Sequence, residues 1–169
     1  MIKCILVDFG GVLTKNSDFK EFHKVGHEWI PIEELLARWH KAKVDEITLD
    51  QFLEGVPNKQ EYLNGYYSKE RFAPGYRKVL KTLRKKYVLC MLSNHITDML
   101  LPLIKEKKID KLFDEVLISG KGLAKPNPEF FLFACKILGL KTSECVLIDD
   151  LKGNIGSAKK NRDYYCVGK

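Results

Sequence analysis

The stretch KCILVDFGGVL, residues 3–13, decides the fold of this chain. Its first part, residues 3–7, is a short apolar run whose hydrophobicity is continuous rather than alternating. This pattern is typical of a strand that is buried on both faces, as in a parallel sheet covered by helices. Asp8 ends the run, and the glycine pair Gly10-Gly11 then allows a sharp turn and a close approach of a ligand to the backbone. The stretch therefore predicts a buried strand with an acidic group at its carboxyl end.

Four further runs of the same apolar, partly β-branched kind follow along the chain, at residues 87–92, 115–118, 145–148 and 164–167. Helical patterns separate them, at residues 75–86, 97–107, 128–138 and 154–161. Strands that alternate with helices predict an α/β fold, in which an open parallel sheet carries helices on both faces.

The segment 14–73 interrupts this alternation. At about 60 residues it is far too long for an ordinary connection between a strand and a helix. It contains helix-like pieces, at residues 17–27, 31–42, 48–53 and 58–67. It is also rich in aromatic residues, and we expect most of them to form its own core and one or two to line a pocket. The segment therefore predicts a helical insertion over the carboxyl-terminal edge of the sheet.

Polar residues follow the predicted strands at the edge where the carboxyl ends of parallel strands meet. These residues are Asp8, Ser93, Asn94, Lys125, Asp149 and Asp150. Carboxylates placed close together repel one another unless a cation lies between them, and an all-oxygen set of ligands suits Mg²⁺. A lysine nearby can neutralise phosphoryl oxygens. The serine and the aspartates could also cap the helices that follow them, and the two roles can coexist.

Four motifs occur in a fixed order along the chain: DFGGVL, LSN, KPNPEFF and IDDLKGNIGSAK. In order and spacing they resemble the motifs of the haloacid dehalogenase-like superfamily, over residues 2–13 and 74–158. The resemblance implies a Rossmann-like α/β core, formed by residues 1–13 and 74–169, with a small all-helical cap at residues 14–73. It also implies a Mg²⁺-dependent hydrolase.

The resemblance assigns catalytic roles to Asp8 and Lys125 and phosphate-binding roles to Ser93, Asn94 and Lys125. Asp8 matches the nucleophile, which in the family attacks phosphorus and forms an aspartyl-phosphate. Ser93, together with the amide of Asn94, matches the phosphate-binding position. Lys125 matches the residue that holds the nucleophile and the transferring group together.

The resemblance also implies the metal ligands. Asp150 would bind Mg²⁺ directly and Asp149 mostly through water, while Asp8 and the carbonyl of Gly10 would complete the protein ligands. The metal and the lysine would then stabilise phosphoryl transfer electrostatically.

The sequence departs from the family pattern at Gly10. Phosphatases of the family usually carry a second aspartate at this position, which protonates the leaving group and later activates water. Such general acid–base help is typically worth about 10²–10⁴ in rate, so its loss predicts slow turnover, an acidic leaving group or a substitute acid. The substitute candidates are four histidines, namely His95, His23, His27 and His40.

The leading functional hypothesis is a phosphatase that acts on a small phosphorylated metabolite. An alternative is a weakly active or non-catalytic protein that binds phosphate in a regulatory role, because the second aspartate is missing. A further alternative is hydrolysis of a carbon–halogen bond, which uses the same aspartate without Mg²⁺. The pair Asp149-Asp150 argues against this last alternative, because it looks suited to binding a metal that such a reaction does not use.

Composition narrows these possibilities. The 169 residues are 45% hydrophobic and 30% charged, as in a globular protein, and neither a secretory signal nor a membrane-spanning run is found. The apolar surroundings of most of the five cysteines favour free thiols and a cytoplasmic location.

The net charge of +7 comes partly from residues 77–86, where Val79, Leu80 and Leu83 form an apolar stripe and the basic residues face solvent. We therefore expect a small phosphorylated substrate rather than a nucleic acid or a membrane, and the oligomeric state stays open.

Overall fold

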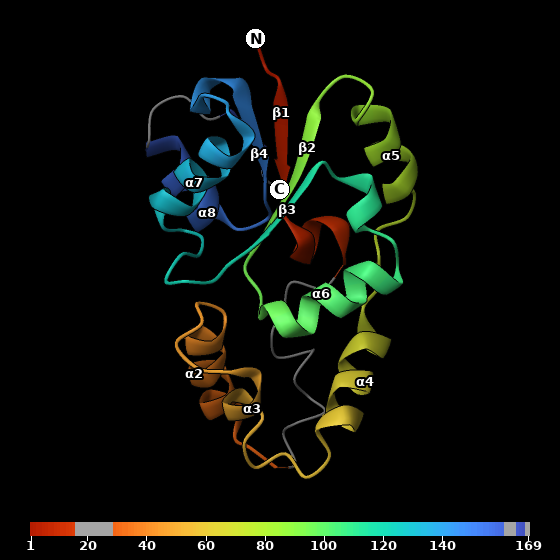
Figure 1. The fold of residues 1–169 in the computed structure, drawn as a ribbon, viewed down its shortest axis with the longest axis vertical. Helices are drawn as coiled ribbons and strands as arrows, with labels where there is room; N and C mark the ends of the chain where they lie inside the picture. The colour runs from red at the N-terminus through yellow and green to blue at the C-terminus, as the bar shows by residue number, and fades with distance from the viewer. Residues whose placement is uncertain (16–28, 161–164, 168–169) are drawn as a thin grey trace.

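The protein is described by a computed structural model that covers residues 1–15, 29–160 and 165–167. Its centre is an all-parallel sheet of five strands in the order β3-β2-β1-β4-β5 (Figure 1). The strands are β1 (Cys4–Val7), β2 (Val88–Ser93), β3 (Glu115–Ile118), β4 (Cys145–Ile148) and β5 (Tyr165–Val167). The predicted open α/β sheet is confirmed, and each strand begins and ends within one residue of the bounds predicted from the apolar runs.

Two hydrophobic clusters, one on each face, hold the sheet between helices. In β1, Ile5 and Val7 point to a cluster that includes residues of α5 (Tyr76–Leu83) and α6 (Thr97–Glu106). Cys4 and Leu6 point the opposite way, to a cluster with residues of α7 (Pro128–Leu138) and α8 (Lys152–Lys160). Because successive side chains of a strand alternate between faces, one apolar run serves both clusters.

Local sequence signals set the ends of these helices. The side chain of Asn127 accepts a hydrogen bond from the amide of Glu129 at the start of α7, and Pro128 takes the first helical position. Gly139, with φ of 65°, ends the helix in the left-handed conformation that glycine adopts without strain. Short 3₁₀ turns occur at Asp110–Leu112 and Thr142–Glu144.

The inserted segment, residues 14–73, contributes three described helices: α2 (Ile32–Ala42), α3 (Leu49–Phe52) and α4 (Lys59–Lys69). They lie beyond the carboxyl ends of the strands in Figure 1. Their apolar residues form a third cluster, which also takes in Ile96 and Met99 beside and within α6. The helix predicted at residues 17–27 lies outside the described residues.

The two chain connections that lead into and out of the inserted segment lie side by side. Thr14 and Phe72 form an antiparallel bridge. Backbone hydrogen bonds flank it, from the amide of Lys15 to the carbonyl of Arg71 at 2.7 Å and from the amide of Ala73 to the carbonyl of Leu13 at 2.9 Å. The segment therefore leaves and re-enters the sheet region at one point.

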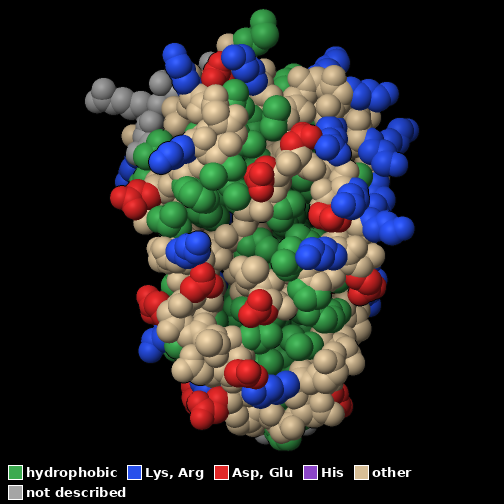
Figure 2. Space-filling model, in the orientation of Figure 1, with side chains coloured by type: hydrophobic (Ala, Val, Ile, Leu, Met, Phe, Trp, Pro, Cys, Tyr) green, Lys and Arg blue, Asp and Glu red, His purple; other side chains and the backbone are tan. Residues whose placement is uncertain are grey.

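The predicted apolar stripe of α5 is partly wrong. Leu80 is buried and Leu83 packs on the cluster, but the Val79 side chain is 56% exposed. The stripe consists instead of Tyr76, Leu80 and Leu83, at positions i, i+4 and i+7, and Val79 lies beyond its edge. The basic residues of this region are exposed as expected, and Figure 2 shows Lys and Arg side chains gathered over this flank. No helix in the described part of the chain has the length and apolar character that a bilayer crossing requires.

Candidate active site

The carboxyl ends of the three central strands bring the predicted residues together. Asp8 directly follows β1, Ser93 is the last residue of β2, and Asp149 directly follows β4. Lys125 reaches the same place from the loop after β3. Because β1 lies between β2 and β4, these side chains meet around Asp8.

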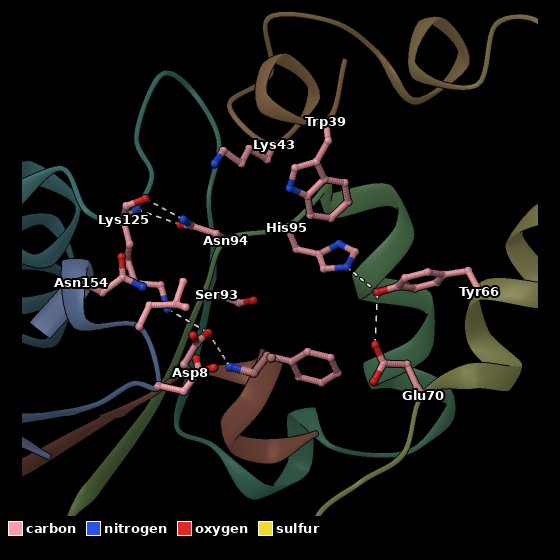
Figure 3. Close-up of a pocket in the computed structure, with 14 residues that line it drawn as sticks. Asp8, Trp39, Lys43, Tyr66, Glu70, Ser93, Asn94, His95, Lys125 and Asn154 are labelled. Carbon is pink, nitrogen blue, oxygen red and sulfur yellow. Dashed lines mark hydrogen bonds and ion pairs between the residues drawn. The ribbon is translucent and has the colours of Figure 1, made fainter. Parts of the chain in front are cut away.

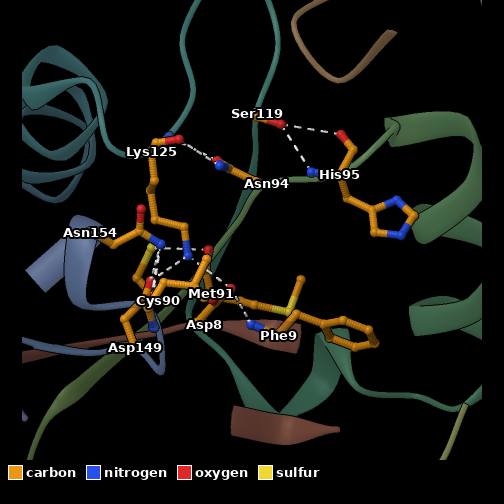
Figure 4. A network of polar contacts seen from close by, with 11 residues as sticks. Asp8, Phe9, Cys90, Met91, Asn94, His95, Ser119, Lys125, Asp149 and Asn154 are labelled. Atoms are coloured by element: carbon orange, nitrogen blue, oxygen red, sulfur yellow. Dashed lines mark hydrogen bonds and ion pairs between the residues drawn. The ribbon is translucent and has the colours of Figure 1, made fainter. Parts of the chain in front are cut away.

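Lys125 forms the centre of a buried ion-pair network. Its Nζ lies 2.8 Å from Asp8 Oδ1 and 2.7 Å from Asp149 Oδ2, and the lysine side chain is 1% exposed (Figure 4). Asp149 also accepts hydrogen bonds from Asn154 Nδ2, at 2.9 and 3.0 Å, and from the amide of Leu151 at 2.9 Å. The start of α8 therefore holds Asp149 rigidly, as the capping role of this aspartate predicts.

A third carboxylate gives the site an excess of negative charge. Oxygen atoms of Asp8, Asp149 and Asp150 lie within 4.8 Å of one another, whereas Lys125 supplies one positive charge to them. Asp150 Oδ1 is buried and has no hydrogen-bond partner among the described residues. An unbonded, buried carboxylate oxygen next to two more carboxylates fits a hard divalent cation.

Gly11 fixes the position of Asp150. Its φ of 71° is in the left-handed region, and a Cβ atom built on it would fall against the Asp150 carboxyl group, 2.9 Å from Oδ1 and closer still to Oδ2. Only glycine combines this backbone conformation with space for the carboxylate. Gly10 has φ of −68° and ψ of 133° and lines the same cavity.

Burial raises the pKa of Asp8 to about 7. Lys125 opposes this increase through its charge and its hydrogen bond, and the neighbouring Asp149 adds to it. The amide of Phe9 donates a hydrogen bond to Asp8 Oδ1 at 2.7 Å, which also favours the ionised form. A divalent cation beside Asp8 would favour the ionised carboxylate further.

Asn94 has a structural role in addition to its predicted one. Its Nδ2 donates to the carbonyl of Lys125 at 2.6 Å, and its Oδ1 accepts from the amide of Lys125 at 2.8 Å. This reciprocal pair ties the loop that carries Lys125 to the end of β2. Ser93 is buried, and both Ser93 and Asn94 line the cavity in front of Asp8 (Figure 3).

His95 does not supply the missing acid. Its Nδ1 lies 3.0 Å from the carbonyl of Ile96, which can only accept, so Nδ1 carries the ring proton of the neutral histidine. Its Nε2 then accepts from the hydroxyl of Tyr66 at 2.5 Å. Burial lowers the pKa of His95 to about 4, so the ring is neutral at physiological pH and has no proton to give from Nε2. Of the other candidates, His40 is exposed, and His23 and His27 lie outside the described residues.

The sequence reasoning did not identify Glu70, which lines the cavity next to Tyr66. Burial raises its pKa to about 7, although a hydrogen bond to Thr14 opposes this increase. Its Oε1 lies 3.4 Å from the hydroxyl of Tyr66, and its buried Oε2 has no hydrogen-bond partner among the described residues. No motif contains Glu70, and only the packing of α4 brings it to the cavity.

The raised pKa of Glu70 makes stability depend on pH. The folded state favours the protonated form, so this contribution is fully present below pH 4.5 and is lost as the pH rises through about 7. The shift from 4.5 to about 7 corresponds to about 3 kcal/mol. We expect Glu70→Gln, which is neutral and of the same shape, to be less affected than the wild type by a change from pH 5 to pH 8. Urea denaturation of both proteins at the two pH values measures the difference, and a constant difference in unfolding free energy would contradict the prediction.

The cavity in front of Asp8 has a volume of about 190 Å³. Its floor comes from the sheet, and its opposite wall comes from the inserted segment, through Trp39 and Lys43 of the α2 region and Tyr66 of α4 (Figure 3). Trp39 packs edge-on against His95, with ring centroids 4.8 Å apart. The expectation that one or two aromatic residues of the segment line a pocket is met by Trp39 and Tyr66. The four-residue spacing of Trp39 and Lys43 could have indicated their shared face, but not that this face meets the site.

The sheet and the site define a class of protein, in which an open α/β fold carries carboxylates and a lysine at the carboxyl ends of its strands. Comparisons with known proteins agree with this description of the fold and the site. The family model of the haloacid dehalogenase-like hydrolases matches residues 2–161. The chain therefore belongs to the haloacid dehalogenase-like hydrolase family.

Two curated relatives have different activities. A phosphoglycolate phosphatase of Haemophilus influenzae is 29% identical over 135 residues, which cover 73% of this chain and 58% of the relative. The (S)-2-haloacid dehalogenase 4A of Burkholderia cepacia is 27% identical over 110 residues, which cover 64% of this chain and 48% of the relative. The chain thus spans about half the length of these relatives.

A solved structure is similar over the whole chain. It is a family enzyme from Bacteroides thetaiotaomicron, in complex with magnesium and inorganic phosphate. Its TM-score is 0.81 and its identity 25%, and the match covers 98% of this chain and 94% of that enzyme.

Proposed function

We propose that this protein is a Mg²⁺-dependent phosphatase that hydrolyses a small phosphomonoester through Asp8, with residues 14–73 as a cap over the site. The observation that carries the proposal is the cluster of three carboxylates around Lys125, where the lysine pairs with Asp8 and Asp149 and Asp150 Oδ1 has no partner among the described residues. A relative of the same fold holds magnesium and phosphate together, and a curated relative is a phosphatase.

The ligands for the metal are the three carboxylates and the backbone at Gly10. Asp150, Asp8 and the Gly10 carbonyl would hold Mg²⁺, and Asp149, which Lys125 and Asn154 already occupy, would contribute mostly through water. When bound, Mg²⁺ would neutralise charge on the phosphoryl oxygens and on the carboxylates.

The protein's own groups account for the first step. Ser93 and the amide of Asn94 would hold the phosphoryl group, and Lys125 would keep it against the nucleophile. Asp8 Oδ1 already accepts from Lys125 and from the amide of Phe9, so Oδ2 keeps its lone pairs for the attack on phosphorus. A bond forms between Asp8 and phosphorus as the bond to the leaving oxygen breaks.

The second step is hydrolysis of this aspartyl-phosphate by water, which returns Asp8 to its carboxylate. With Gly10 in place of an acid, the leaving oxygen takes its proton from water in the cavity. Poor leaving groups should therefore react slowly, by up to about 10²–10⁴ relative to a site with a positioned acid.

The test is phosphate release from p-nitrophenyl phosphate, whose leaving group needs little protonation. We expect release in Mg²⁺ to exceed release in EDTA at least about tenfold. Equal rates in the two buffers would contradict the proposal.

The absence of a carboxyl group at Gly10 favours a second candidate, a protein that binds phosphate without turning it over. Calorimetry would then detect binding of inorganic phosphate in Mg²⁺ while no phosphomonoester is hydrolysed. Halide release from 2-chloropropionate in EDTA would instead support hydrolysis of a carbon–halogen bond.

A further inference from the structure

A tight turn lies between β3 and Lys125. Gly120 and Leu123 form an antiparallel bridge, in which each amide donates to the other residue's carbonyl at 2.9 Å. The two residues between them, Lys121 and Gly122, have φ of 50° and 77°, as in a two-residue hairpin turn of type I′. The bridge uses the amides of its own two residues, so the amides of Lys121 and Gly122 need partners outside the turn.

The inserted segment supplies both partners, directly after α2. The carboxylate of Asp45 accepts from the amide of Lys121 at 2.8 Å, and the carbonyl of Val44 accepts from the amide of Gly122 at 3.0 Å. Asp45 has φ of 64°, in the left-handed region that aspartate and asparagine enter more readily than other residues with a side chain. The chain after α2 therefore docks on the tip of the turn through its backbone and through one side chain.

Gly120 leaves the space that the Asp45 carboxylate occupies. A Cβ atom built on Gly120 would lie 2.5 Å from Asp45 Oδ2 and 3.2 Å from its Cγ. A larger residue at position 120 would therefore push the carboxylate away from the amide of Lys121. Gly120 does not have a left-handed φ, so the need for glycine here comes from the contact with Asp45 and not from the backbone conformation.

The sheet side of this contact is fixed at both ends. Before the turn, Ser119 Oγ accepts from the amide of His95 at 3.0 Å and lies 3.2 Å from its carbonyl, to which it donates (Figure 4). After the turn, Asn94 holds the backbone of Lys125 through the reciprocal pair described above. The turn is therefore a fixed platform beside the end of β2, and the inserted segment is the part that would move if the contact were lost.

The contact bears on the wall of the cavity because its residues directly follow α2. Lys43 and Trp39 line that wall, two and six positions before Asp45. Beside the contact, a groove separates the inserted segment from the sheet region, with Glu46 on one side and Phe133 on the other. Side-chain packing thus leaves this flank partly open, and the hydrogen bonds to the turn tie the end of α2 to the sheet region there.

We propose that Asp45 is a positioning residue, which docks the inserted segment on the turn at residues 120–123 and so holds the end of α2 over the cavity. Hydrogen bonds to a carboxylate are stronger than those between neutral groups. Because Asp45 is exposed, water competes for its carboxylate, and loss of this one bond should loosen the segment without unfolding it. The proposal does not depend on the phosphatase function, since docking is measured without turnover.

The test is hydrogen exchange at two amides of the turn, followed by NMR. The amide of Gly122, bonded to Val44, reports docking, and the amide of Leu123, bonded within the turn, reports the turn itself. Asp45→Gly removes the carboxylate and tolerates the left-handed φ. We expect it to speed exchange at Gly122 about fivefold or more and to leave Leu123 unchanged. Asp45→Asn, which keeps an acceptor, should restore most of the protection.

Gly120→Ala tests the same contact from the other side. Alone, it should speed exchange at Gly122 as Asp45→Gly does. In the Asp45→Gly protein it should add nothing, because the carboxylate that it would displace is gone. Glu46→Ala is the matched control, since it removes the neighbouring exposed acid, and exchange at Gly122 should equal that of the wild type. Additive effects of the first two changes, or faster exchange in the control, would overturn the proposal.

The indole resonance of Trp39 follows the wall of the cavity. The chain has two tryptophans, so Trp39→Phe assigns this resonance. It should shift in Asp45→Gly and return toward the wild-type position in Asp45→Asn. An unchanged Trp39 resonance, unchanged exchange at Gly122, or faster exchange at Leu123 as well would overturn the role of Asp45. Thermal denaturation must show that each variant folds, and Gly120→Ala decides the question if Asp45→Gly does not fold.

Discussion

Replacement of Asp8 by asparagine should reduce Mg²⁺-dependent phosphate release by about 10³-fold or more while the protein stays folded. Asparagine keeps the shape of the side chain and can still accept the hydrogen bond from the amide of Phe9. It removes the charge that attacks phosphorus. Lys125 remains paired with Asp149, so the variant leaves no buried cation without a partner.

The control for this prediction is stability. Since burial raises the pKa of Asp8 to about 7, the metal-free wild type carries an unfavourable buried charge at pH 8 that the variant lacks. We therefore expect the metal-free variant to melt no lower than the wild type at pH 8. A folded variant that keeps a tenth or more of the activity, a change of about 1.4 kcal/mol in the barrier, would place the nucleophile elsewhere.

Gly11→Ala should weaken Mg²⁺ binding about 10- to 100-fold without touching a ligand itself. The added methyl group would fall against the carboxyl group of Asp150, which must then move away from Asp8. Asp150→Ala removes the ligand and should weaken binding further. Calorimetric titration with Mg²⁺ measures both effects.

Gly75→Ala is the matched control for Gly11→Ala. Gly75 has a similar φ of 75°, but a Cβ atom there would meet nothing within 4 Å. It carries the same backbone strain, on the order of 1 kcal/mol, without the collision. If Gly75→Ala weakens Mg²⁺ binding as much as Gly11→Ala does, the effect comes from backbone strain and the assignment of Asp150 is wrong. Unchanged affinity in Asp150→Ala would contradict it directly.

The sheet could be predicted from the sequence because its strands are buried on both faces. A run such as residues 145–148 contains no polar interruption, and its bounds coincide with β4. The strand ends then determine which side chains meet, so the convergence of Asp8, Lys125 and Asp149 followed from topology alone. The helical periodicity of apolar residues predicts burial less well than a continuous apolar run does. Val79 is an example, since a residue at the edge of an apolar stripe can be assigned to either face of the helix.

The wall opposite the sheet could not be predicted. Whether Lys43 and Glu70 reach the cavity depends on how α2 and α4 pack on one another and on Met99, and no short-range pattern encodes that packing. The role of His95 likewise depended on one distant partner. The hydroxyl of Tyr66, 29 positions earlier in the chain, donates to Nε2 of His95, so this nitrogen is a hydrogen-bond acceptor and not an acid.

The bridge between Thr14 and Phe72 would allow the inserted segment to be exchanged for another one. Its two ends already lie at hydrogen-bonding distance, so a segment of any length whose ends meet can take its place without moving β1 or the turn that carries Asp8. Loop-closure entropy rises only slowly with length, so such replacements cost little. Under the proposed function, the sheet would hold the chemistry and residues 14–73 would set the choice of substrate, so the two properties could diverge independently.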